Sequence, residues 1–416
     1  GMGDSEPSIQ YEFDKVYKLH EMWVWNSNQL IESFVGLGAK DVVIEISSNG
    51  TDWTPLENVP EFAQAPGKAD YAHNTSIDFG GVMAKQVKLS ISAGYGMLPQ
   101  YGLSEVRFFY VPTLPREPQP ADAEVTDTVD VVLSWRAGRE AASHEVYLGT
   151  DSADLALVQT ASEPSAAIGP LNYGTTYYWQ IVEVNDTEDP ATYAGDIWSF
   201  STPAFGVVDS FDQYDDNCNR IFFAWLDGLG HNGGEDIDDC DVAPYNGNGT
   251  GSIVGNANAP FAERTIVYAG NQSMPLEYDS GVSETTISLD PQDWTTSGIQ
   301  TLSLQIHGAA DNTGQLYLKI NNTKVLYEGL ADALQRQQWI PWNIDLAATG
   351  ANLSNVTSLT LGIENASAIG MLYVDEIRVY PLPAQTIDPV LPDDSDPSLA
   401  AHYEFEGNAN DSTGNY

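Results

Sequence analysis

The sequence has few cationic side chains. It contains 16 Lys and Arg residues against 59 Asp and Glu residues, which gives a formal net charge of −43 at pH 7. Binding to nucleic acid requires cations that replace the counterions of the phosphates, so this composition argues strongly against a nucleic-acid partner. It argues equally against anionic membranes. A medium rich in salt or calcium would screen the repulsion among so many carboxylates.

Long apolar runs and cysteines are also scarce. No run approaches the about 18 residues that a membrane helix needs, so we expect no membrane insertion. The two cysteines, Cys218 and Cys240, lie 22 positions apart. An oxidising compartment would allow them to form a disulfide, whereas a metal site would need further ligands of that kind. Whether the two thiols pair stays open.

Helical periodicity is almost absent from the chain. Short runs of alternating apolar and polar residues are separated by Gly, Asn, Asp and Pro about every eight to twelve residues. Hydrophobic residues make up 42% of the chain, which is too much for a disordered acidic protein. The pattern predicts an all-β fold of tandem β-sandwich and jelly-roll domains.

Segments rich in proline divide the chain. They lie at 111–124, 200–211 and 381–398. They hold Pro and Asp more than Gly and Ser, which indicates semi-rigid spacing. The expected domains are therefore 1–112, 113–203 and 204–382, followed by a Pro/Asp linker at 383–398 and the start of another domain at 399–416.

The second expected domain contains "VVLSWRAGREAASHEVYLGTD", "LNYGTTYYWQIVEVND" and "GDIWSFST". These segments resemble a fibronectin type III domain, which implies an immunoglobulin-type sandwich between the other two domains. Four aromatic residues are expected to fill its core: Trp135, Tyr177, Trp179 and Trp198. We interpret His144 and Arg136 as exposed strand residues and not as ligands.

The first expected domain starts with "IQYEFDKVYKLHEMWVWN" and closes with "YGLSEVRFF". Between them, Asn49-Gly50 forms a hairpin turn and Trp53 packs beneath it. The pattern resembles the discoidin, or coagulation-factor 5/8 type C, jelly-roll, and Ser104-Glu105-Val106 matches its closing strand. The calcium loop of that family would lie before residue 1, so we expect no metal in this domain.

Ligands of the discoidin family meet the loops at one end of the barrel. An aromatic ring can cover the apolar face of a pyranose, and planar polar side chains can hydrogen-bond its hydroxyl groups. We predict carbohydrate binding by the residues of these types in the corresponding loops: Trp25, Asn26, Asn28, Tyr71, His73, Tyr95 and Tyr101. The alternative is that the rings belong to the core and the Asn side chains cap turns.

The third expected domain opens with "DSFDQYDDNCNRIFFAW" and ends with "MLYVDEIRVYP". Both ends resemble carbohydrate-binding jelly-rolls, in which the first and last strands are neighbours. That arrangement would bring together four acidic residues: Asp209, Asp212, Asp375 and Glu376. Because Ca²⁺ prefers six to eight oxygen ligands, the pattern predicts a structural calcium ion. The alternative is that these acids, and those of the loop with Asp236, Asp238 and Asp239, only solvate the domain.

Patterns typical of enzymes are missing. There is no Gly-x-Ser-x-Gly nucleophile elbow and no P-loop lysine. Pairs of carboxylates say little in a chain with 59 acidic residues, and a glycosidase needs a large cleft that modules of this size do not suggest. We therefore expect no catalytic activity within this chain.

The last residues, "LAAHYEFEGNANDSTGNY", resemble the start of a laminin-G-like jelly-roll. The order of modules resembles that of large secreted proteins of planctomycete-type bacteria. No signal peptide is visible, and we expect both ends to be cut from a longer protein. We predict a non-catalytic extracellular or cell-surface protein that binds glycans through its first and third domains. Two alternatives stay open: a structural or adhesive protein that contacts cell-surface proteins, and an accessory region of a larger glycoside hydrolase.

Overall fold

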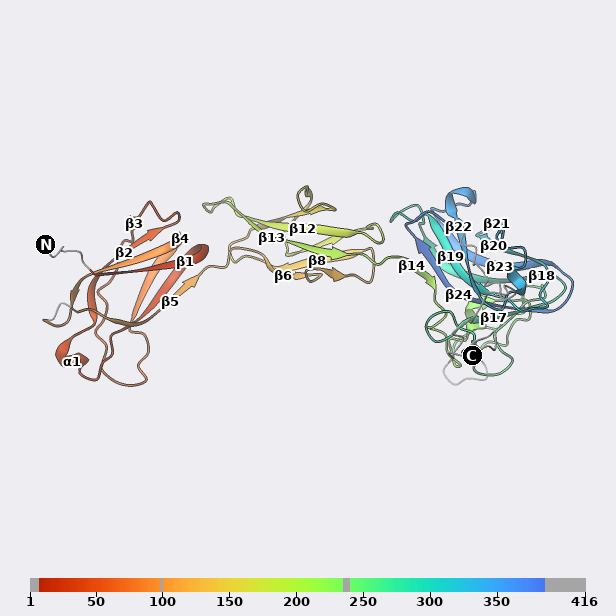
Figure 1. Cartoon of the computed structure of the whole chain (residues 1–416), viewed down its shortest axis with the longest axis horizontal. Coiled ribbons are helices and arrows are strands. Elements are labelled where there is room, and N and C mark those ends of the chain that lie inside the picture. Colours follow the sequence, from red (N-terminus) through yellow and green to blue (C-terminus); the bar gives the residue numbers. More distant parts are fainter. Residues whose placement is uncertain (1–6, 98–99, 235–239, 386–416) are drawn as a thin grey trace, which may run out of the picture. The chain divides into compact units, whose positions relative to one another are not determined.

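The computed structural model describes residues 7–97, 100–234 and 240–385, and the regular secondary structure of these residues is almost all β-strand (Figure 1). The prediction of an all-β chain is confirmed. The expected laminin-G-like start at 399–416, residues 386–398 of the expected linker, and the acidic residues Asp236, Asp238 and Asp239 lie outside the described residues. No helix within the described part is long and apolar enough to cross a membrane.

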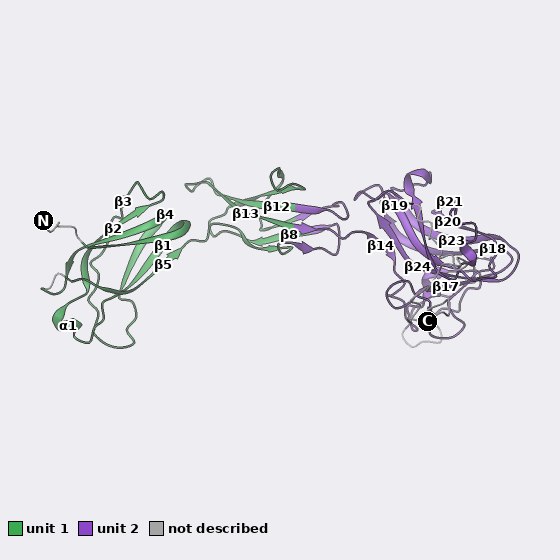
Figure 2. Ribbon diagram, viewed as in Figure 1, with its two compact units in different colours: residues 1–122, 132–166, 178–199 green, residues 123–131, 167–177, 200–416 purple. Residues whose placement is uncertain are grey.

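The chain divides into two compact units, which Figure 2 shows in green and purple. One comprises residues 1–122, 132–166 and 178–199, and the other comprises residues 123–131, 167–177 and 200–416. Strands of the middle sandwich occur in both units, so the units do not follow the domain boundaries expected from the sequence.

One antiparallel sheet of five strands lies within residues 8–110, in the order β3-β2-β4-β1-β5. Its elements are β1 (Ser8–Asn26), α1 (Glu32–Val35), β2 (Ala39–Ser47), β3 (Thr54–Pro55), β4 (Thr75–Gly94) and β5 (Leu103–Tyr110). Near the end of β1, Met22 and Val24 are fully buried, and Trp23 and Trp25 alternate with them on the opposite face. The two tryptophans therefore belong to the outer face of this sheet.

The middle sandwich has two sheets, in the orders β10-β9-β12-β13-β7 and β11-β8-β6. Its strands are β6 (Arg116–Gln119), β7 (Glu124–Val125), β8 (Val131–Arg136), β9 (Ser143–Gly149), β10 (Ala156–Ala161), β11 (Ser165–Ile168), β12 (Thr176–Val184) and β13 (Thr192–Ser201). The four aromatic residues expected in its core, Trp135, Tyr177, Trp179 and Trp198, are all buried, as predicted.

The interpretation of His144 as an exposed residue is wrong. His144 lies on the same face of β9 as Val146 and Leu148, and its side chain is buried. Its Nδ1 atom pairs with the carboxylate of Glu183, which also accepts a hydrogen bond of 2.9 Å from the Gly138 N–H. A polar side chain can occupy this core position because its partner is buried with it. Arg136 is exposed, as expected, and pairs with an exposed glutamate.

The third domain is a sandwich of two sheets, in the orders β16-β17-β24-β19-β22, with β14 paired to β24, and β15-β18-β23-β20-β21. Its elements are β14 (Gly206–Asp209), α2 (Ile221–Ala224), β15 (Trp225–Leu226), β16 (Ile253–Val254), β17 (Met274–Tyr278), β18 (Gly281–Gln292), β19 (Thr301–His307), β20 (Gln315–Ile320), β21 (Thr323–Leu326), β22 (Trp339–Asp345), β23 (Val356–Ala366) and β24 (Gly370–Tyr380), with short 3₁₀ turns at Ala333–Gln335 and Leu346–Ala348. One apolar core lies between the sheets. The first strand pairs with the last, as predicted, with Asp209 opposite Ile377.

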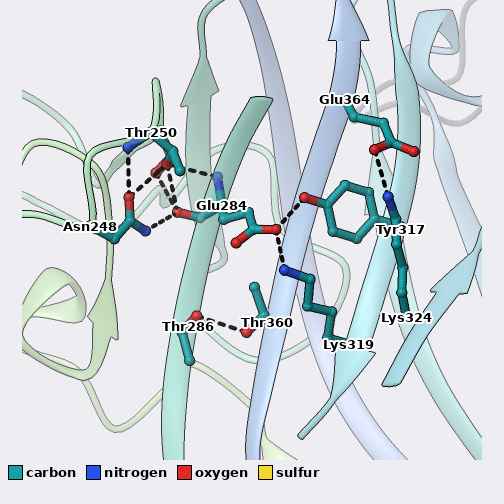
Figure 3. A network of polar contacts seen from close by, with 10 residues as sticks. Asn248, Thr250, Glu284, Thr286, Tyr317, Lys319, Lys324, Thr360 and Glu364 are labelled. Atoms are coloured by element: carbon teal, nitrogen blue, oxygen red, sulfur yellow. Dashed lines mark hydrogen bonds and ion pairs between the residues drawn. The ribbon is translucent and has the colours of Figure 1, made fainter. Parts of the chain in front are cut away.

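The outer face of the second sheet is closed by its own polar side chains (Figure 3). The Tyr317 ring lies against Gly362, is 1% exposed and donates its hydroxyl hydrogen bond to Glu284. The Lys324 ammonium lies 3.9 Å from the centre of the same ring and pairs with Glu364. This face therefore offers no open aromatic surface, and the outer face of the first sheet is the one to consider for binding.

Candidate functional site

The first sheet of the third domain aligns side chains from four strands in one row. Pro275 of β17 is opposite Tyr373 of β24, Tyr373 is opposite His307 of β19, and His307 is opposite Trp339 of β22. The side chains of Tyr373, His307 and Trp339 alternate along their strands with buried Leu, Ile and Val residues, so they lie on the outer face. The row brings three rings together from segments that lie far apart in the sequence.

A fourth ring, that of Tyr268, extends this row from a loop. The ring centres of Tyr268 and Trp339 are 6.0 Å apart. The ring centre of His307 lies 5.4 Å from that of Trp339 and 5.7 Å from that of Tyr373. The ring planes are inclined by 62° to 78° in each pair. Tyr268 is 49% exposed, and the other three rings are half-buried. The four rings, which we call the aromatic row, form an uneven and accessible surface.

Asp375 holds the loop that carries Tyr268. This residue is fully buried, and its Oδ2 atom accepts hydrogen bonds from the Tyr268 N–H (2.8 Å) and the Ala269 N–H (3.2 Å). Its Oδ1 atom accepts from the Glu376 N–H at 2.8 Å. Burial raises the pKa of the Asp375 carboxyl to about 6. Asp375 thus positions the aromatic row and is not itself exposed to a ligand.

The stability of the third domain should fall as the pH rises through the pKa of Asp375. The folded-state pKa of about 6 is above the ordinary value of 3.8, so folding favours the protonated carboxyl. Its contribution is complete below about pH 4 and is lost as the pH passes 6, a change of roughly 3 kcal/mol at most. The check is the difference in free energy of unfolding between the wild type and Asp375→Asn, which should fall between pH 4 and pH 7. A difference that is flat or rises would contradict this assignment.

Gln305 supplies a buried acceptor beneath the aromatic row. It lies between Asp375 and Pro341 in the next row of the same sheet. Its Oε1 atom is buried and has no hydrogen-bond partner within the described residues. Because an unmet buried acceptor is costly, a hydroxyl group that reached Gln305 would gain a favourable hydrogen bond.

The other end of the same outer face is covered by the chain itself. After β24, residues 381–385 run back across it, with Thr301 donating to the Leu382 carbonyl at 2.6 Å and Asn343 Nδ2 donating to the Gln385 carbonyl at 2.7 Å. Residues 381–385, the last ones described, do not reach the end of this face that carries the aromatic row.

The four acids predicted to bind calcium have protein partners of their own. Asp209 accepts four hydrogen bonds, Asp212 accepts one from the Asn271 N–H, and Glu376 pairs with Arg378 at 2.6 Å. Asp375 binds the Tyr268 loop. Within residues 7–97, 100–234 and 240–385, no group of three or more His, Cys, Asp or Glu side chains could hold a metal ion. The structure does not assemble these four as a ligand set, and calcium binding stays a prediction.

The two cysteines are free thiols in the structure, and Cys218 is exposed. A hydrogen bond with Cys218 is the main cause that raises the pKa of Cys240 to about 11, so the two sulfur atoms are neighbours. A disulfide between them stays a prediction for an oxidising compartment.

Several of the predicted carbohydrate ligands in the first domain serve the fold. Asn26 is fully buried, and its amide binds Ala39 through both its oxygen and its nitrogen at 2.9 and 2.7 Å. Tyr71 donates its hydroxyl hydrogen bond to the Asn26 carbonyl, and Tyr95 donates to the Phe62 carbonyl. Asn28 holds the backbone of Lys68. The half-buried Tyr101 packs against the core of this domain.

Trp25 and His73 do lie together, although on the face of the sheet. His73 stacks on Trp23 with ring centres 4.2 Å apart, and its centre is 5.3 Å from that of Trp25. The guanidinium of Arg107 covers Trp25 at 4.9 Å, and Phe109 lies 4.5 Å from Trp23. Trp23, Trp25 and His73 are half-buried, as are three of the four rings of the aromatic row, and this cluster has no ring as exposed as Tyr268.

Searches for similar proteins gave structures only. No family model matches the chain, and no curated protein matches it. One similar structure is a carbohydrate-binding module of the β-sandwich superfamily, with 11% identity, a TM-score of 0.26, and coverage of 64% of this chain and 98% of the other.

Two more come from Clostridium thermocellum. The family 11 carbohydrate-binding module of a cellulosomal cellulase has 13% identity and a TM-score of 0.26 and covers 44% of this chain and 98% of its own. An Fn3-like protein has 18% identity and a TM-score of 0.19 and covers 22% of this chain and 95% of its own. These similarities are to β-sandwich modules, and they assign no residue of this chain to a function.

Proposed function

We propose that the third domain binds a neutral polysaccharide on the aromatic row. The observation that carries the proposal is the alignment of Tyr373, His307 and Trp339 on three neighbouring strands, with Tyr268 beside them and the unmet acceptor of Gln305 beneath. Rings of this kind cover the apolar C–H faces of pyranoses, and a few fixed polar groups orient the hydroxyl groups. The inclined ring planes suit a single twisted chain better than a flat crystalline surface.

The charge around the aromatic row favours a neutral ligand. Glu277 lies on the same outer face, and the charge of Glu263 acts on Tyr373, whose pKa is raised first by burial and then by that charge. Arg378 on this face pairs with Glu376 and stacks on Phe205 at 4.1 Å. Arg336, three residues before Trp339, pairs with Asp332 at 3.0 Å. A uronic acid or sulfate group would meet acidic side chains, and these two arginines already pair with carboxylates.

Binding without hydrolysis is part of the proposal. A glycosidase holds two carboxyl groups at the scissile bond, about 5 to 9.5 Å apart, with access to the substrate. The carboxyl group that holds the Tyr268 loop, that of Asp375, is fully buried and binds three backbone N–H groups. Its raised pKa follows from burial and does not require a catalytic role.

The ring cluster of the first domain is a second candidate for carbohydrate binding, because Arg107, Trp25 and His73 are in contact on an outer face. With two binding domains the chain would act as an extracellular or cell-surface glycan-binding protein, and weak sites in tandem would gain avidity. Two alternatives stay open: a structural role in which these aromatic surfaces contact protein partners, and a role as an accessory region of a larger glycoside hydrolase.

Affinity electrophoresis tests the proposal directly. The full chain is run in native gels that contain a β-glucan, a xylan, agarose or polygalacturonate, with a non-binding protein as mobility reference. We expect retardation by at least one neutral polysaccharide and none by polygalacturonate. Unchanged mobility in every gel would refute carbohydrate binding, and retardation by polygalacturonate alone would refute the neutral class.

A further inference from the structure

A cavity opens at the side of the third domain, and Pro341, two residues after Trp339 on β22, is part of its lining. It has a volume of about 590 Å³ and lies between β21 and β22, the terminal strands of the two sheets. None of Tyr268, His307, Trp339 and Tyr373 lines it. Its volume is within the range of about 300 to 1,000 Å³ that is usual for small-molecule sites.

The cavity combines an aromatic floor with a polar rim. Tyr327 meets Trp342 edge to face with ring centres 5.3 Å apart, and Trp342 is 6% exposed. The rim carries Glu328 and Asp345, whose side chains are exposed, and the hydroxyl of Thr349. This composition suits a ligand that has both C–H faces and hydroxyl groups.

The charge of the rim selects against anions. Glu328 and Asp345 are acidic, and the one cation of the lining, Lys324, is paired with Glu364 (Figure 3). A carboxylate or sulfate group would therefore enter an acidic site without a free counter-charge. A neutral sugar has no charge for these carboxylates to repel.

We propose that this cavity is a second carbohydrate site of the third domain, which takes the end or a side branch of a neutral oligosaccharide. The inference rests on the proposed function, because it assigns the same class of ligand to both sites. Two sites held on one folded domain bind one polymer with a high effective concentration, so a polysaccharide is bound more tightly than its short fragments.

Two neighbouring alanines provide a matched test. Ala348 and Ala347 are both exposed on the same 3₁₀ turn, but only Ala348 lines the cavity. We expect Ala348→Trp to fill the cavity, to remove one bound tetrasaccharide per chain and to weaken polysaccharide binding at least about 10-fold. Ala347→Trp should bind as the wild type does. The probe for calorimetry is the tetrasaccharide of the neutral polysaccharide that retards the chain most: cellotetraose, xylotetraose or neoagarotetraose.

Each outcome decides the matter. If the wild type and Ala348→Trp bind the same number of tetrasaccharides per chain, the second site is refuted and the proposed function stands. The same conclusion follows if Trp339→Ala abolishes all carbohydrate binding by the third domain. If the wild type binds no polysaccharide in the gels, the proposed function itself fails. Should Ala348→Trp melt at a much lower temperature than the wild type, Glu328→Trp, at another residue of the cavity lining, replaces it, with the same expected loss of one site.

Discussion

Replacing Trp339 by alanine is expected to weaken polysaccharide binding by about 100-fold, or about 2.7 kcal/mol. Trp339 is the largest ring of the aromatic row, and it contacts both Tyr268 and His307. Its loss removes the surface on which a pyranose would lie and the packing that orients two neighbouring rings. Affinity electrophoresis over a range of polysaccharide concentrations measures the change in dissociation constant.

Three variants separate this effect from others. Trp339→Phe keeps a ring and should recover much of the affinity. Tyr147→Ala removes a half-buried ring from β9 of the middle sandwich and should leave binding unchanged. Trp25→Ala reports on the first domain alone. If Trp339→Ala binds like the wild type while its melting temperature is also unchanged, the aromatic row is not the binding surface.

Replacing Asp209 by alanine is expected to destabilise the third domain by about 4 kcal/mol. Asp209 is buried, and its Oδ2 atom accepts from the Tyr214 hydroxyl at 2.7 Å and from the Trp225 Nε1–H at 2.8 Å. Its Oδ1 atom accepts from the Phe211 N–H at 2.8 Å. The substitution leaves buried donors without an acceptor, and each costs about 1 to 3 kcal/mol. Chemical denaturation of the full chain measures the loss as a lower midpoint for this domain.

Asp212→Ala is the matched control. Asp212 is exposed and accepts a single hydrogen bond, so its loss should cost less than about 1 kcal/mol. Chelator extends the comparison to the predicted calcium ion. If calcium is bound through Asp209, chelator lowers the melting temperature of the wild type and leaves Asp209→Ala unaffected. Equal and small losses for the two variants would contradict a structural role for Asp209 in this hydrogen-bond network.

Sequence patterns anticipated the strands and much of the core, because the signal for both is local. Alternation along a strand separates Leu304 and Ile306 from Gln305 and His307 with no knowledge of any partner strand. The same reasoning placed Trp135 and Trp179 in a core correctly. It failed at His144, because a polar residue on a buried face is acceptable only with a buried partner, and Glu183 lies 39 residues away in the sequence.

The functional residues were harder to find. Trp25, Asn26, Tyr71 and Tyr95 have suitable side chains for sugars, but Asn26 and the two tyrosine hydroxyls are used by the backbone of their own domain. Those hydrogen bonds join segments that are distant in the sequence, so no spacing of residues predicts them. Conversely, the sequence analysis did not single out Tyr373, His307 or Trp339, because nothing local indicated that these residues of three strands share a row.

By itself, the sequence determined the acidic composition and the all-β class, while the pairing of the first and last strands of the third domain was implied by the resemblance to carbohydrate-binding jelly-rolls. Composition and period-two alternation depend only on a residue and its near neighbours, so they can be read along the chain. Only the tertiary structure decided that Tyr373, His307 and Trp339 lie side by side and that Asp375 holds a loop beneath Tyr268. The register between strands is set by packing over the whole core, and a shift of one residue would have turned these rings inward.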